Sequence, residues 1–181
     1  MLAPPGEDCW LGGVLGSVSS TVVRQANCPV AVIHDEDPPD PHAPVLVGID
    51  GSPVSELATR IAFDEACGRG VDVMALYAWS DVTVNDILDV LELDWATVEP
   101  EAERRLAESL AGFQERYPDV TVHRLVVCDR PARQLAEKSE SAQLVVVGSH
   151  GRGGLAGMAL GSVSNAILHS VRVPVLVARP T

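Results

Sequence analysis

The sequence is poor in aromatic residues, in positive charge and in long apolar runs. Aromatic residues make up 4% of its 181 positions, and 13 Lys and Arg stand against 25 Asp and Glu, which gives a formal net charge of −12. An acidic chain lacks the basic face that supplies most of the affinity for nucleic acid. No apolar run approaches the ~20 residues that a bilayer-spanning helix needs. We therefore expect no nucleic-acid partner and no membrane insertion.

Cysteine is also scarce and is not arranged for metal or redox chemistry. The four cysteines form no CxxC pair, and no signal peptide precedes them: Cys9, Cys28, Cys67 and Cys128. This pattern predicts reduced thiols in a cytoplasmic protein, three of them buried in or beside apolar segments as small hydrophobic residues. No metal site is expected.

Apolar strands alternate with helical patterns along most of the chain. The run Val45–Ile49 ends at Asp50, and Ser52-Pro53 then supplies an N-cap and a first helical position. Such alternation predicts a five-stranded parallel sheet with helices on both faces, an α/β fold of Rossmann-like type. Strands are expected at Val45–Ile49, Val71–Trp79, Val120–Val127, Leu144–Gly148 and Val173–Ala178, and helices from Pro53 and at Glu99–Tyr117, Pro131–Ser139 and Ser162–Ser170. The acidic segment 80–98 is predicted to be a loop with a partial helical turn, either a lid or ordinary surface.

The chain also contains an internal repeat. Residues 155–179 align without a gap onto residues 10–34 at an offset of 145, so that LGSVS and PV recur in both. Repeats of this kind indicate two copies of one domain. We expect residues 1–34 to be the C-terminal helix and strand of a first copy, 35–43 to be a Pro- and Asp-rich linker, and 44–181 to be a complete domain. Strand 29–33 is the repeat of strand 173–178, whose apolar edge would otherwise be exposed.

A glycine-rich segment follows the strand Leu144–Gly148. It reads GSHGRGGLAGMALGSVS over residues 148–164. Glycine lets main-chain N–H groups approach a ligand closely, and Ser162 is expected to cap a helix whose N-terminus favours anions. The segment therefore predicts a phosphate site. Gly151–Ala156 also fits a dinucleotide fingerprint, but it follows the fourth strand and lacks the acidic residue that the fingerprint requires.

The motif resembles one known family. Gly148, Gly151, Gly161 and Ser162 fit G-x2-G-x9-G-[ST], the pattern of the ATP-binding class of universal stress proteins, and the strand ending VGIDGS resembles that family's opening strand. The resemblance implies an adenine nucleotide alpha hydrolase-like fold. It covers Pro44–Pro180, with 10–34 resembling the tail of a second unit, as in a tandem protein truncated in its first domain. Because the dimers of that family are organised about a pseudo-twofold, the resemblance also implies that strand 29–33 pairs antiparallel with strand 173–178.

The resemblance also implies a ligand and its contacts. ATP is the expected cofactor, with Mg held through the phosphates. Adenine and ribose are expected between Asp50 and the main chain near Ala78 and Val147. The remaining contacts would come from the glycine segment, with Arg152 adding charge: Gly148, His150, Gly151, Gly161, Ser162, Val163 and Ser164.

We find no catalytic residue in the sequence. His150 has no partner in a triad-like or metal-ligand pattern, and no P-loop motif is present. The favoured function is ATP binding in a stress response or regulation, without strong catalysis. The alternatives are a nucleotide-independent dimerisation or interaction module, using strands 29–33 and 173–178, and a slow ATP hydrolase.

Overall fold

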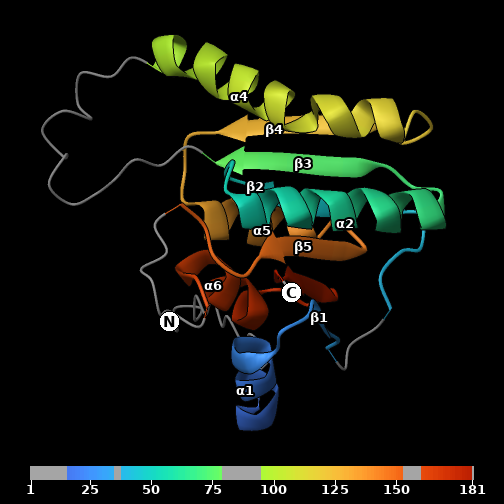
Figure 1. Cartoon of the computed structure of the whole chain (residues 1–181), viewed down its shortest axis with the longest axis vertical. Coiled ribbons are helices and arrows are strands. Elements are labelled where there is room, and N and C mark those ends of the chain that lie inside the picture. Colours follow the sequence, from blue (N-terminus) through green and yellow to red (C-terminus); the bar gives the residue numbers. More distant parts are fainter. Residues whose placement is uncertain (1–15, 35–37, 79–94, 153–159, 181) are drawn as a thin grey trace, which may run out of the picture.

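A computed structural model describes residues 16–34, 38–78, 95–152 and 160–180. Its centre is a mixed sheet of six strands in the order β1-β6-β5-β2-β3-β4 (Figure 1). The strands are β1 (Val30–Val32), β2 (Val45–Ile49), β3 (Val73–Ala78), β4 (Val122–Val127), β5 (Leu144–Gly148) and β6 (Val175–Ala178). The helices are α1 (Ser17–Gln25), α2 (Pro53–Arg69), α4 (Trp95–Arg116), α5 (Pro131–Ser139) and α6 (Ser162–Ser170).

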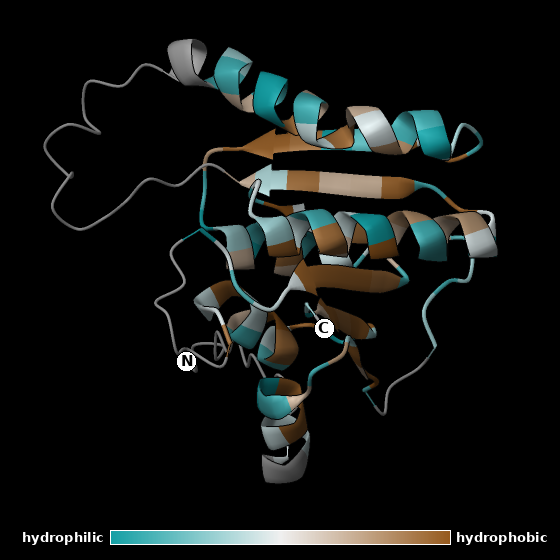
Figure 2. Cartoon of the chain, in the orientation of Figure 1, coloured by the Kyte–Doolittle hydropathy of each residue, from teal (hydrophilic) through white to brown (hydrophobic). Residues whose placement is uncertain are grey.

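Two apolar cores lie on the two faces of the sheet. On one face, Phe63 of α2 and Leu106 of α4 pack against β2 and β3. On the other face, Leu135 of α5 and Ile167 of α6 pack against β5 and β6. β2 and β5 are covered on both faces, which explains why their sequences are apolar runs without alternation (Figure 2).

Helix α2 begins as the sequence predicts. The Ser52 hydroxyl accepts a hydrogen bond from the Ser55 N–H at 3.2 Å, and Pro53 occupies the first helical position. Gly70 ends the helix with a positive φ of 66°, a conformation in which a Cβ is disfavoured. These residues fix the start of α2 directly after the tip of β2.

The sheet has one strand more than the predicted five. β2 to β6 pair in parallel with their neighbours, and β1 joins the edge of β6 in the antiparallel direction, so the sheet is mixed. The predicted antiparallel pairing of strand 29–33 with strand 173–178 is confirmed over Val30–Val32, where Val30 lies opposite Val177. The sixth strand arises because the α1–β1 segment adds to the edge that β6 would otherwise expose.

The structure also differs from the sequence interpretation at the cysteines and at the start of α4. The expected burial of cysteine is wrong for the described thiols, since Cys28, Cys67 and Cys128 are all exposed at the ends or outer faces of elements. α4 begins at Trp95, inside the segment predicted as a loop, and tolerates Pro100 near its start. Most of the segment 80–98 that was expected to be either a lid or ordinary surface, the glycines at 153 and 154, and residues 10–15 of the repeat lie outside the described residues.

Candidate functional site

The sheet opens between β2 and β5 at its carboxyl edge. Their ladder runs from Val45 opposite Leu144 to Val47 opposite Val146 and stops there. The other neighbours of these strands stay paired to the tips, with Ile49 opposite Tyr77. The chain order also reverses between β2 and β5. In open α/β sheets this reversal point forms the crevice in which ligands bind.

Asp50 organises the mouth of this crevice. Its Oδ1 accepts a hydrogen bond from the Ser52 N–H at 2.9 Å, and its Oδ2 accepts one from the Arg152 N–H at 3.0 Å. Its own N–H donates to the Ser55 hydroxyl at 3.1 Å. The carboxylate therefore connects the turn after β2 to the loop after β5, and it is half-buried rather than freely solvated.

Glycine at position 151 is needed for this connection. A Cβ there would collide with Oδ2 of Asp50. Gly51 is the second position of this kind, because its φ is 79° and a Cβ on it would lie 2.8 Å from Nη2 of Arg152. Both glycines thus let the loops after β2 and β5 approach each other closely, which agrees with a cradle built from main-chain groups.

The N-terminus of α6 lies against the same loop. A Cβ on Gly161 would lie 3.3 Å from both the His150 Cα and the Ser149 carbonyl oxygen. The predicted cap is wrong: Gly161 is the N-cap residue, Ser162 is the first helical residue, and no side chain caps the helix. Ser162 is exposed, so its hydroxyl remains available at the helix N-terminus.

Some of the predicted phosphate donors are already used within the chain. The Gly161 N–H donates to the Ser149 carbonyl at 2.7 Å, and the Ser164 hydroxyl donates to the Gly148 carbonyl. Others are not used. Within the described residues, the main-chain N–H groups of Ser162, Val163 and Ser164 have no hydrogen-bond acceptor, as expected for the first turn of a helix.

Ala78 is the last residue of β3, and Val147 is the last residue but one of β5. Ala78 pairs with Val127, and Val147 pairs with Val177 and is 3% exposed. Their side chains belong to the core on the α5–α6 face. These two residues therefore offer a ligand mainly their backbone, as the sequence interpretation requires.

His150 is half-buried in the loop, with Nδ1 3.1 Å from the Ser149 hydroxyl.

Of the described residues, no group of three His, Cys, Asp or Glu side chains is placed to hold a metal ion. In the described part of the chain, no helix is long and apolar enough to cross a membrane. The geometry supports binding through backbone amides more than acid–base catalysis.

Close contacts join some of the predicted residues: Asp50 meets Gly151 and Arg152, Gly161 meets His150, and Ser164 meets Gly148. The Arg152 backbone lies in the loop, but its guanidinium carbon stands 5.8 Å from the centre of the Tyr77 ring, over the end of β3. No pattern in the sequence indicates the direction of the Arg152 side chain, because a long side chain on a loop can point anywhere around its Cα.

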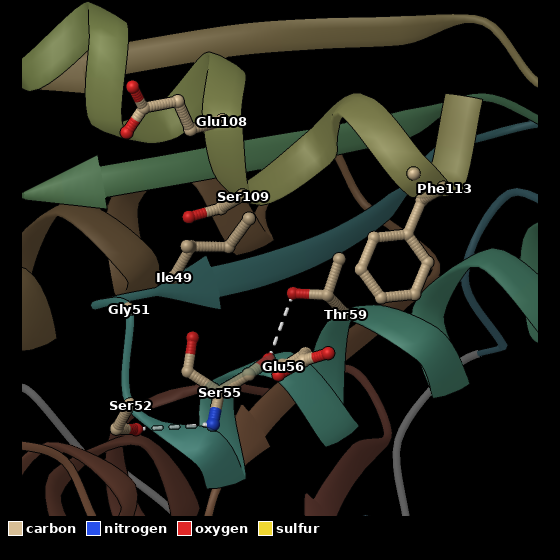
Figure 3. Close-up of a pocket in the computed structure, with 10 residues that line it drawn as sticks. Ile49, Gly51, Ser52, Ser55, Glu56, Thr59, Glu108, Ser109 and Phe113 are labelled. Carbon is tan, nitrogen blue, oxygen red and sulfur yellow. Dashed lines mark hydrogen bonds between the residues drawn. The ribbon is translucent and has the colours of Figure 1, made fainter. Parts of the chain in front are cut away.

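A pocket that the sequence interpretation missed adjoins the site. It encloses about 340 Å³ between α2 and α4, and Figure 3 shows Ser55 and Ser109 on its two walls. Among its described lining residues are two carboxylates and no basic side chain, so it does not favour phosphate. The signal in the sequence was polar residues on the inner side of α2. The lining consists of Ile49, Gly51, Ser52, Ser55, Glu56, Thr59, Glu108, Ser109, Gly112 and Phe113.

An open, doubly covered sheet with a crevice at its reversal point defines an α/β protein of Rossmann-like architecture. The model of the universal stress protein family matches residues 42–179, and the chain belongs to that family. It is 66% identical to universal stress protein Rv2005c of Mycobacterium tuberculosis over 99% of this chain and 61% of that relative. The chain thus spans about three fifths of the length of that relative.

Solved structures show the same fold. A universal stress protein from Archaeoglobus fulgidus matches 92% of this chain and 55% of its own, with a TM-score of 0.62 and 24% identity. A universal stress protein in complex with cAMP matches 77% of this chain and 98% of its own, with a TM-score of 0.50 and 24% identity. At this identity the likeness concerns the fold alone.

Proposed function

We propose that the chain binds ATP or a related adenine nucleotide in the crevice between β2 and β5, and that occupancy of this site regulates its conformation or its partners in a stress response. The observation that carries the proposal is the set of three N–H groups at the start of α6. Among the residues that the structure describes they have no acceptor, and they lie against a loop held by Asp50. A phosphate supplies the acceptors and the negative charge that a helix N-terminus favours.

The proposed ligand extends from the strand tips to α6. Adenine and ribose would lie between Asp50 and the backbone of Ala78 and Val147, and Gly148, His150 and Gly151 would line the ribose and α-phosphate. The β- and γ-phosphates would accept hydrogen bonds from the N–H groups of Ser162, Val163 and Ser164 and from the Ser162 hydroxyl, with Gly161 shaping the turn. Any Mg would be held by the phosphates, because the described residues offer no ligand cluster. A family member solved with cAMP supports an adenine nucleotide as ligand.

The domain interpretation is part of the same proposal. Residues 44–181 would form one complete nucleotide-binding domain, residues 35–43 a linker, and residues 1–34 the final helix and strand of a preceding copy. The supporting observation is that α1 is followed by β1 in the same way as α6 is followed by β6. We expect no strong catalysis, because we identify no base beside the proposed phosphates among residues 148–152 and 160–164, and a slow ATP hydrolase is the limit of the expected activity.

A second candidate is an interaction module that works without nucleotide. The observation that favours it is the antiparallel β1–β6 ladder, in which an edge strand recruits a strand of related sequence. The two candidates differ in their response to ATP, since an interaction module should assemble equally with and without it.

Isothermal titration with ATP tests the first candidate. The unmodified chain should bind ATP, and Gly151→Ala should weaken binding at least tenfold, because the new Cβ would displace the Asp50 carboxylate or the loop. Gly68→Ala is the matched control, since a Cβ there meets nothing within 4 Å. Absence of ATP binding at millimolar concentration in the unmodified chain would reject the proposal.

A further inference from the structure

The Arg152 side chain extends from the glycine loop after β5, past the end of β2, toward the end of β3. Its N–H is held by Oδ2 of Asp50, while Nη2 lies 2.8 Å from the position of a Cβ on Gly51. Its guanidinium carbon is 5.8 Å from the Tyr77 ring centre. Both neighbours of the guanidinium belong to the tips of β2 and β3.

This location is separated from the proposed phosphate end. α6 follows β5, and in the sheet order β5-β2-β3 the strand that carries Tyr77 is the second neighbour of β5 (Figure 1). Tyr77 directly precedes Ala78, whose backbone lies at the proposed base end. The Arg152 guanidinium therefore lies at the end of the crevice where a base and a ribose would bind.

Tyr77 is buried, whereas Arg152 is exposed. Tyr77 is 3% exposed and belongs to the core that α2 and α4 form with the sheet. Within the described residues, the Arg152 guanidinium has no hydrogen bond and no ion pair of its own, only the contact with the Tyr77 ring. A planar cation in this position can stack on an aromatic face and can form hydrogen bonds in its own plane.

We infer that Arg152 acts at the base end of the nucleotide site, where its guanidinium packs against the purine from the side of Tyr77, and that it does not bind the phosphates. The inference rests on the proposed function and adds a specificity residue to it. A phosphate contact would depend on the charge of Arg152, whereas contact with a base depends on the planar shape of its guanidinium.

The test measures the affinities of adenosine, AMP and ATP for the unmodified chain, Arg152→Ala and Arg152→Lys. We expect Arg152→Ala to weaken all three ligands by the same factor, about 5-fold for a contact of about 1 kcal/mol. Arg152→Lys should show the same loss, because lysine keeps the charge and lacks the plane. Arg60→Ala, at an exposed position on α2, removes the same charge and should leave all three affinities unchanged.

Each other result overturns a distinct claim. A loss that grows from adenosine to ATP and is restored by lysine would assign Arg152 to the phosphates and reject the inference. Unchanged affinities in Arg152→Ala would reject any role in binding. If the unmodified chain binds none of the three ligands, the proposed function fails, and the inference fails with it.

Discussion

Ala31 on β1 lies opposite Leu176 on β6, the residue 145 positions later that is its counterpart in the internal repeat. The flanking pairs are reciprocal, since Val30 lies opposite Val177 and Val32 opposite Val175. Each strand thus offers the same positions to the other, as in an isologous contact about a two-fold axis. Within one chain, the edge of β6 is covered by a strand related to it by sequence.

Docking of the α1–β1 segment should depend on Val23 and not on Val22. Val23 is 1% exposed and belongs to the core on the α5–α6 face, whereas Val22 is 51% exposed. We expect Val23→Ala to lower the free energy of unfolding by about 2 kcal/mol, through lost burial and a residual cavity. Val22→Ala should change it by less than about 0.5 kcal/mol. Urea unfolding measures both, and equal effects would show that α1 is not docked as described.

Hydrogen exchange adds a local measurement of the same docking. The amides of β1 should exchange slowly in the unmodified chain and faster in Val23→Ala, because the ladder with β6 opens when α1 loses its anchor. Rapid exchange of β1 in the unmodified chain would contradict the pairing.

Two helix starts that look alike in the sequence should respond differently to loss of a serine. Ser52 caps α2 through its hydroxyl, so Ser52→Ala should cost about 1 kcal/mol of stability. Ser162 lies one position inside α6 and caps nothing, so Ser162→Ala should cost less than about 0.5 kcal/mol. Thermal unfolding of the two variants compares them, and an equal loss would place Ser162 at the cap after all.

The success and failure of the sequence interpretation follow from burial. The strands β2 and β5 were predicted residue for residue, because strands covered on both faces are apolar throughout and end abruptly at Asp50 and Ser149. The β1–β6 pairing was predicted from the repeat, from the apolar edge that strand 173–178 would expose and from the resemblance to a family of dimers. Local pattern was therefore sufficient for β2 and β5, whereas the edge pairing needed information from distant parts of the chain.

The failures at the candidate site have two causes. The cap of α6 was displaced by one residue, because Gly161 and Ser162 are both good capping residues and only the backbone decides between them. The direction of the Arg152 side chain and the pocket between α2 and α4 depend on side chains from elements that are far apart in the sequence. No spacing within one segment reports such contacts.

Nucleotide binding should protect the start of α6 specifically. The N–H groups of Ser162, Val163 and Ser164 have no acceptor within the described residues, so they should exchange with solvent readily and slow when a phosphate accepts from them. The amides of β1 should keep their rate, apart from the general stabilisation of about 2.7 kcal/mol expected at a ligand concentration 100 times Kd. Exchange measured with and without ATP distinguishes the nucleotide site from a pure interaction module, which predicts no change at α6.

Glu101 on α4 should titrate far below an ordinary glutamate. Its carboxylate accepts hydrogen bonds from Arg104 and Arg105, which lower its pKa from 4.5 to about 2. Because the folded pKa is the lower one, the resulting stabilisation is complete above about pH 4.5 and is lost as the pH falls toward 2. The pairs are exposed, so added salt should weaken the effect.

An NMR titration of the Glu101 side chain measures this pKa, and Arg104→Gln supplies the comparison. The Arg104 hydrogen bond is the largest cause of the shift, so its removal should raise the pKa of Glu101 toward 4.5, while the remaining bond from Arg105 keeps it below that value. A pKa near 4.5 in the unmodified chain would show that the two arginines do not hold the carboxylate in solution. In that case α4 would keep its place through its apolar face, above all Leu106 and Leu110, which are fully buried against the sheet and need no charge to stay there.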